Sequence, residues 1–271
     1  MNPIARPWIV AALFGMMVLI PTKALAGMTS EEVQQFESAK AKAEKGDARA
    51  QFSIGAYYNA GYGVRKDDEE AVRWFLKAAE QGLVNAQFIC GRKYENGYGV
   101  EKDYGEAVKW YRKAADQGYA DAQNSLGTCF KIGQGVPRDY IESVRWYRKA
   151  ADKENDEAQC NLGICYANGE GVARDQAEAV KWYRKGAEQG NAQAQCNLGF
   201  CYAIGDGVAK DEIEAYAYFW LGRYNGNERA FMNFATLEKK LTPEGRLRGQ
   251  YRAKRLQREI DAKIEAKKAA R

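Results

Sequence analysis

The most informative absence in this chain of 271 residues is histidine, which occurs nowhere. Catalytic triads, most general bases that work near neutral pH, and most zinc and haem sites depend on an imidazole. The S-x-x-K and K-T-G motifs of serine β-lactamases are also missing. The sequence therefore argues against an enzyme, because catalysis would have to rest on carboxylates or tyrosines that no motif singles out.

The chain also lacks an apolar run long enough to span a bilayer, which takes about 20 residues. Its longest run, 8–20, has 13 residues and lies between Arg6 and Pro21. Ala24-Leu25-Ala26 then matches a small-x-small cleavage site. This order predicts a secretory signal peptide over residues 1–26, so that the mature protein begins at Gly27 and is periplasmic or secreted. An uncleaved signal anchor is the alternative.

The positive charge is confined to one end of the chain. The whole sequence has a formal net charge of +5, whereas residues 237–271 alone hold 12 Lys and Arg against 5 Asp and Glu. The preceding body is therefore mildly acidic, which, together with export, disfavours nucleic acid as a partner. The basic end indicates either an acidic partner or membrane surface, or simply a solvated helix face.

What the sequence does contain is a repeat. The fragment G-x-G-V-x-x-D occurs five times with a period of 36 residues, each time between two helical patterns. A fixed period of this length predicts a solenoid, in which each unit buries its apolar face only against its neighbours. The five fragments begin at Gly61, Gly97, Gly133, Gly169 and Gly205.

The first helix of each copy contains a glycine at a constant position. Glycine within a helix costs about 1 kcal/mol, so its return in all five copies predicts a close helix crossing that leaves no room for a Cβ. By contrast, we expect the glycines of the G-x-G turn to provide only freedom of φ. Replacing Gly127 by Leu should therefore destabilise the fold more than replacing Gly135 by Ala. The helix glycines are Gly55, Gly91, Gly127, Gly163 and Gly199.

The second helix of each copy opens on the Asp of the fragment, with a Glu three residues later. This spacing predicts a capping box. An Ala or Ser then precedes an aromatic residue by three positions, which suits interdigitated helix packing. The Asp/Glu pairs are Asp67/Glu70, Asp103/Glu106, Asp139/Glu142, Asp175/Glu178 and Asp211/Glu214.

Taken together, the pattern A-x-x-x-x-x-L-G-x-x-Y-x-x-G-x-G-V-x-x-D-x-x-x-A-x-x-W-x-x-K-A-A-x-x-G resembles the Sel-one-like repeat, a relative of the tetratricopeptide repeat. The resemblance implies an all-α, right-handed superhelical solenoid of antiparallel helix pairs over residues 48–226. Residues 27–47 would form an N-terminal capping helix, for which Ser30 is a candidate cap. Residues 227–262 would form C-terminal capping helices, and 263–271 a basic tail.

The same resemblance implies a scaffold that binds a protein or peptide along the concave face formed by its first helices, as a monomer without cofactor or metal. The groove positions fall six and three residues before the helix glycine, and one, four and five after it. They are occupied by Arg49, Phe52 and Asn59 in the first copy, Asn85, Phe88, Arg92 and Glu95 in the second, Asn124 and Lys131 in the third, Ile164 and Asn168 in the fourth, and Phe200 and Ile204 in the fifth. The groove would be polar at its start and apolar at its end.

The six cysteines leave two interpretations open. Two pairs keep the same 31-residue separation across adjacent copies, Cys129–Cys160 and Cys165–Cys196, and are candidate disulfides in an exported protein. Free, buried thiols are the favoured alternative. Cysteine-rich relatives bridge the two helices of one copy, but this chain has Ala151 and Ala187 at the required position.

The sequence thus predicts an exported, non-catalytic scaffold for protein interactions. One alternative is a cell-wall protein of the same fold that binds or weakly hydrolyses peptidoglycan or β-lactams, an activity described for some cysteine-rich relatives. A second alternative is a secreted factor that meets host proteins.

Overall fold

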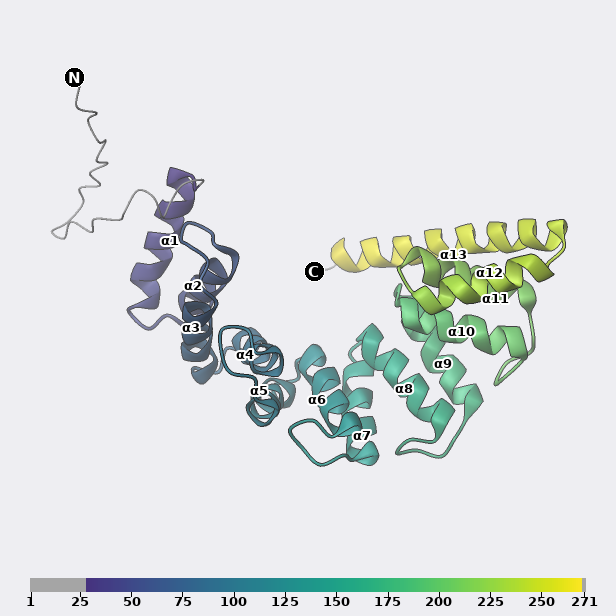
Figure 1. Cartoon of the computed structure of the whole chain (residues 1–271), viewed down its shortest axis with the longest axis horizontal. Coiled ribbons are helices and arrows are strands. Elements are labelled where there is room, and N and C mark those ends of the chain that lie inside the picture. Colours follow the sequence, from purple (N-terminus) through teal and green to yellow (C-terminus); the bar gives the residue numbers. More distant parts are fainter. Residues whose placement is uncertain (1–27, 270–271) are drawn as a thin grey trace, which may run out of the picture. The chain divides into compact units, whose positions relative to one another are not determined.

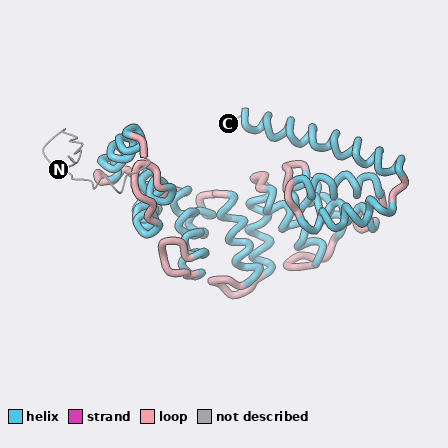
Figure 2. The backbone as a smooth tube through the Cα atoms, turned by 45° about the horizontal axis from the view of Figure 1, so that its top comes forward, coloured by secondary structure: helices cyan, strands magenta, loops and turns pink. Residues whose placement is uncertain are grey.

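The computed structural model describes residues 28–269, and every regular element in this range is an α-helix (Figures 1 and 2). The chain divides into a first unit that ends at Gln81 and a second that begins at Gly82. The predicted signal peptide, residues 1–26, lies outside the described residues. The all-α solenoid expected from the repeat is confirmed within both units.

The first unit consists of α1 (Ser30–Ala43), α2 (Ala48–Ala60) and α3 (Asp68–Glu80). Its core is formed by Phe36, Ile54 and Phe75, which are buried. The cap of α1 is Thr29, and not Ser30 as predicted. The Thr29 hydroxyl accepts from the Glu32 backbone N–H at 3.2 Å, and the Glu32 carboxylate accepts from the Thr29 N–H at 2.7 Å, which completes a capping box.

The second unit stacks helix pairs so that first and second helices form two layers. Figure 1 shows the first helices on the inner side of this unit's curve. The first helices are α4 (Val84–Asn96), α6 (Ala120–Ile132), α8 (Asp156–Asn168) and α10 (Ala192–Ile204), followed by α12 (Glu228–Lys240). The second helices are α5 (Tyr104–Asp116), α7 (Tyr140–Ala151), α9 (Gln176–Ala187) and α11 (Glu212–Tyr224), followed by α13 (Pro243–Ala269).

The helix glycines lie at close crossings, as predicted. A Cβ added to Gly127 would stand 2.7 Å from Cδ1 and 2.8 Å from Cε1 of Tyr147, whose ring reaches the glycine from the second helix of the same repeat. Gly91 meets Tyr111 and Gly199 meets Phe219 in the same way. The glycine therefore makes room for a ring that is itself buried in the core.

The expectation that the turn glycines provide only freedom of φ is wrong. Gly135 has a φ of +70°, but a Cβ there would also stand 2.1 Å from the backbone carbonyl oxygen of Tyr104. Gly171 meets the Tyr140 carbonyl at the same distance. The second glycine of these two turns therefore lies against the start of the preceding repeat's second helix, and freedom of φ is only part of its role.

The predicted capping box is half present. The Asp103 carboxylate accepts from the Glu106 backbone N–H at 3.0 Å. The Asp103 N–H, however, donates to the carbonyl of Tyr94 at 3.0 Å, so it needs no return bond from Glu106. Glu106 instead pairs with Lys109 at 2.5 Å, one turn further along α5.

The last helix, α13, is longer than predicted. It runs to Ala269 without a break, so residues from 263 onward continue the helix and do not fray into a tail. Lys263 pairs with Glu188 at 2.6 Å, and Lys267 with Glu154 at 2.9 Å. The basic end is therefore folded against earlier repeats of the second unit.

Glu154 marks a local departure from the repeat at the place where α13 ends. Its φ is 60°, the only positive value at a non-glycine residue in the described chain, and it stands where the four other copies have Gly82, Gly118, Gly190 and Gly226. Such a backbone is strained for a side chain with a Cβ. Lys267 lowers the pKa of the Glu154 carboxyl through a hydrogen bond and its charge.

All six cysteines are free and buried. The candidate bridges Cys129–Cys160 and Cys165–Cys196 are not formed, in agreement with the alternative of buried thiols. Desolvation raises the pKa of the Cys129 and Cys160 thiols to about 12, which keeps them protonated and unreactive at neutral pH.

Candidate peptide-binding pocket

Side-chain hydrogen bonds join the neighbouring first helices of the second unit. Asn161 on α8 donates to Asn124 on α6 at 3.0 Å. One repeat later, Asn197 on α10 donates to the Cys160 sulfur on α8 at 3.9 Å. These bonds hold neighbouring first helices together. We call the solvent-facing surface of α4, α6, α8, α10 and α12 the first-helix face.

Three of the predicted groove residues belong to the first unit, on α2. Arg49 and Asn59 are exposed. Phe52 is half-buried, because its ring packs 5.4 Å from that of Phe75 on α3. The other ten predicted residues lie on first helices of the second unit.

On α4, two of the predicted residues are committed to packing within the fold. Phe88 lies 5.8 Å from the ring of Tyr111 and 5.1 Å from that of Tyr119. Glu95 accepts a hydrogen bond from the Tyr111 hydroxyl at 2.6 Å. Asn85 and Arg92 are exposed and available to a partner.

In the middle of the face, the predicted polar residues are held by one another. Asn124 is buried and donates to Glu157 at 3.0 Å. Lys131 pairs with Glu170 at 3.0 Å, and Asn168 donates to the other oxygen of the same carboxylate at 3.0 Å. Lys131 and Asn168 therefore come together on Glu170, which the sequence analysis did not single out.

The predicted apolar residues lie toward the end of the face. Ile164 is half-buried against the core. Phe200 and Ile204 on α10 are 43% and 54% exposed, which is unusual for large apolar side chains within a helix layer. The guanidinium of Arg229 on α12 lies 5.9 Å from the centre of the Phe200 ring.

Phe200 forms one wall of a cavity of about 630 Å³. The other walls include Tyr183 from α9, Asn197 from α10 and Arg229 from α12. Two loop residues, Arg174 and Asp206, complete its charged lining. Helices from the fourth, fifth and sixth repeat positions thus meet at this pocket.

Sequence reasoning missed Tyr183 and Arg229. Arg229 stands 36 residues after Gln193, which occupies a groove position, so extending the pattern into the degraded sixth copy would have found it. Tyr183 could not be found in this way, because it belongs to a second helix and reaches the pocket past the first.

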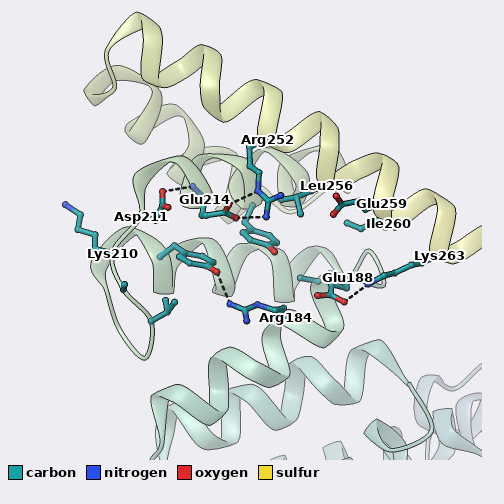
Figure 3. Close-up of a pocket in the computed structure, with 15 residues that line it drawn as sticks. Arg184, Glu188, Lys210, Asp211, Glu214, Arg252, Leu256, Glu259, Ile260 and Lys263 are labelled. Carbon is teal, nitrogen blue, oxygen red and sulfur yellow. Dashed lines mark hydrogen bonds and ion pairs between the residues drawn. The ribbon is translucent and has the colours of Figure 1, made fainter.

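A different cavity, of about 430 Å³, lies between α13 and the stack (Figure 3). Its charges are paired across it: Arg252 binds Glu214 at 2.6 Å, and Lys263 binds Glu188 at 2.6 Å. Arg184 donates to the Tyr202 hydroxyl at 2.8 Å. These pairs satisfy the charged groups within the protein, so the cavity is a seam that attaches α13.

Other kinds of site have less support. Residues 28–269 contain no group of three or more Cys, Asp or Glu side chains placed to hold a metal ion. None of the helices described in this range is both long and apolar enough to cross a membrane.

A stack of helix pairs with exposed aromatic, aliphatic and arginine side chains along one layer defines a helical-repeat scaffold. The Sel1 repeat model matches residues 48–83, 84–119, 120–155, 156–191 and 192–226. The chain therefore belongs to the Sel1 repeat family, in agreement with the resemblance found in the sequence. Members of this family are typical scaffolds for protein–protein interaction and are generally non-catalytic.

Solved structures show the same relationship. A Sel1 repeat protein from Oxalobacter formigenes is 35% identical, with a TM-score of 0.69 over 83% of this chain and 97% of that one. The protective antigen c5321 of uropathogenic Escherichia coli is 29% identical, with a TM-score of 0.57 over 87% of this chain and 58% of that one. The immunity protein PA5088 from Pseudomonas aeruginosa, at 19% identity and a TM-score of 0.50 over 79% of this chain and 83% of that one, shares the fold alone. No curated protein matches.

Proposed function

We propose that this protein is an exported, non-catalytic scaffold that binds a protein or peptide partner on the first-helix face of its second unit. The family supports the general role, because Sel1 repeats are typical of interaction scaffolds. The order of charged, apolar and cleavage-site residues over 1–26 supports export.

One observation carries the choice of face: Phe200 is exposed, lines a cavity and lies beside Arg229, and Ile204 is exposed on the same helix. Aromatic and arginine side chains near a pocket are the residues that most often dominate the energy of an interface. A partner that covered Phe200 would remove apolar surface from water, worth about 25 cal/mol per Å².

Binding is tested with the partner recovered by crosslinking and pull-down. Phe200→Ala should weaken its affinity at least tenfold, or about 1.4 kcal/mol, and Arg92→Ala should do the same if the partner extends along the face to α4. Phe231→Ala is the matched control, because Phe231 is similarly exposed on α12 but does not line the pocket. Circular dichroism should show unchanged helicity in all three variants.

Two other results would contradict the proposal. If both groove variants bind normally while truncation from Lys263 abolishes binding, the end of α13 is the binding site. Turnover of nitrocefin by the purified protein would favour the cell-wall alternative. Export is tested separately by intact mass, since an envelope form that retains Met1 would contradict cleavage before Gly27.

A further inference from the structure

Three second helices of the second unit carry a tyrosine that packs on the helix glycine of its own repeat. In the second repeat, the Tyr111 hydroxyl donates to the Glu95 carboxylate at 2.6 Å. In the third, the Tyr147 hydroxyl shares a hydrogen bond with that of Thr128 at 3.0 Å. Both partners come from the first helix of the same repeat.

Tyr183, the tyrosine of the fourth repeat, has no such partner. Ile164 stands at the position of Thr128, and Ala167 at the position of Glu95, so neither position offers it a hydroxyl or a carboxylate. Tyr183 is only 5% exposed, and its hydroxyl has no hydrogen-bond partner among residues 28–269. Because Tyr183 lines the cavity, its hydroxyl is left open to a hydrogen-bonding group that enters from solvent.

The cavity that Tyr183 lines has the charge to attract an anion. Arg229 enters it from α12 and forms no ion pair with a described residue. Arg174 adds a second cation, and Asp206 is the single acid in the lining, so the lining has a formal charge of +1. Burial raises the pKa of Tyr183 well above its ordinary value, so the hydroxyl stays a neutral donor.

We propose that this pocket binds a carboxylate of a peptide, which accepts from the Tyr183 hydroxyl and pairs with Arg229 while a neighbouring apolar residue lies on Phe200. The second repeat supplies the template, because there the chain's own Glu95 places a carboxylate on the equivalent tyrosine. The inference rests on the proposed function and specifies the chemistry of its partner.

A single negative charge fits the pocket better than a doubly charged phosphate does. The lining offers one net positive charge, and Asp206 would repel the second charge of a phosphate. The carboxylate could come from an Asp or Glu side chain or from a C-terminus, since both present the same two oxygens.

The experiment selects ligands for the mature protein from random peptide libraries. One library contains Asp and Glu but has amidated C-termini; a second lacks Asp and Glu but has free C-termini; a third lacks both kinds of carboxylate. We expect binders from the first or second library, which identifies the source of the carboxylate. In the best binder, replacing the acid by its amide should weaken affinity at least tenfold.

Variants of the pocket then test the geometry. Ala167→Glu places a carboxylate where the second repeat has Glu95. This carboxylate should accept the hydrogen bond of the Tyr183 hydroxyl and weaken the affinity for the peptide at least tenfold. Ala203→Glu is the matched control at the same position of the fifth repeat, where the aromatic is Phe219 and has no hydroxyl. Tyr183→Phe and Arg229→Gln should each weaken binding at least fivefold without changing the thermal midpoint by more than a few degrees.

The possible failures are distinguishable. One such result is that the third library yields peptides that bind as tightly and whose binding depends on Phe200 but not on Arg229. That result would overturn the proposed carboxylate ligand and leave the proposed function standing. Failure to select a binder from any library would overturn the carboxylate pocket, whereas the proposed function is contradicted only if the pull-down partner binds the Phe200→Ala and Arg92→Ala variants normally. Equal binding by Ala167→Glu and the unmodified protein would overturn the assignment to Tyr183.

Discussion

The second helices of the fourth and fifth repeats, α9 and α11, share one pattern but meet different surroundings. On α9, Lys181 and Lys185 are exposed, and the Lys185 ammonium lies 3.9 Å above the ring of Trp182. On α11, Ala217 and Leu221 stand at the same two positions and are fully buried, because α13 packs over them. The same two helix positions are therefore exposed to solvent in the fourth repeat and covered by α13 in the fifth.

Both helices carry a glutamate at the same position, and its ion-pair partner differs between the exposed α9 and the covered α11. Glu178 pairs with Lys181 on its own helix at 2.8 Å. Glu214 has no such lysine, and pairs instead with Arg252 of α13 at 2.6 Å. Positions that are the same in every repeat therefore determine the packing inside the stack. Positions that differ between repeats determine whether a second helix faces solvent or another helix.

The largest expected effect comes from breaking a constant position. Gly127→Leu would push a side chain into the ring of Tyr147, and overpacking of this kind should cost about 3 kcal/mol or more of unfolding free energy. Urea denaturation followed by circular dichroism measures it. A loss below about 1 kcal/mol would contradict the close crossing.

The next effect tests the difference between α9 and α11 directly. Leu221→Lys gives α11 the residue of α9 and buries a charge without a partner, so α13 should detach, at a cost of about 2–3 kcal/mol. The reverse change, Lys185→Leu, concerns an exposed site and should stay within about 0.5 kcal/mol. Hydrogen exchange should show faster exchange in α13 for the first variant only.

A smaller effect separates two glycines of one turn. Gly135→Ala meets the Tyr104 carbonyl and should cost about 2 kcal/mol, the strain of a positive φ plus the displacement of neighbouring backbone. Gly133→Ala has a similar φ, +76°, but its Cβ would be 3.3 Å from the Arg138 Cβ, so the cost should be nearer 1 kcal/mol. Equal losses would mean that φ alone decides.

The smallest effect concerns the end of α13. Truncation after Ala262 removes the pairs of Lys263 with Glu188 and of Lys267 with Glu154, which are largely exposed. The thermal midpoint should fall by a few degrees at most at low salt. High salt should remove the part of this loss that comes from the ion pairs, because exposed charges are screened, and leave the part that comes from the packing of Ile264 against the core. Without Lys267, the pKa of Glu154 measured by NMR should rise toward its ordinary value.

Features that recur in every repeat could be predicted from the sequence, whereas features that occur only once could not. The helix pairs and the helix glycines recur five times, so their pattern stood out and proved correct. The docking of α13 occurs once and left no period, although the change from lysine to Ala217 and Leu221 in the fifth copy was a readable signal. The free hydroxyl of Tyr183 depends on which residue of one helix faces another, and periodicity alone does not contain that information.

The tryptophans of the second helices have a practical consequence. Each of the five repeats carries one: Trp74, Trp110, Trp146, Trp182 and Trp220. The first four lie under a lysine ammonium of their own helix, at 3.8 to 4.0 Å, whereas Trp220 stacks on Tyr224 at 5.4 Å. A chain of residues 27–271 with four of the five replaced by Phe would keep one fluorophore in a known repeat. Because stability in a solenoid is a sum of local and nearest-neighbour contributions, such a set would report the order in which the repeats melt.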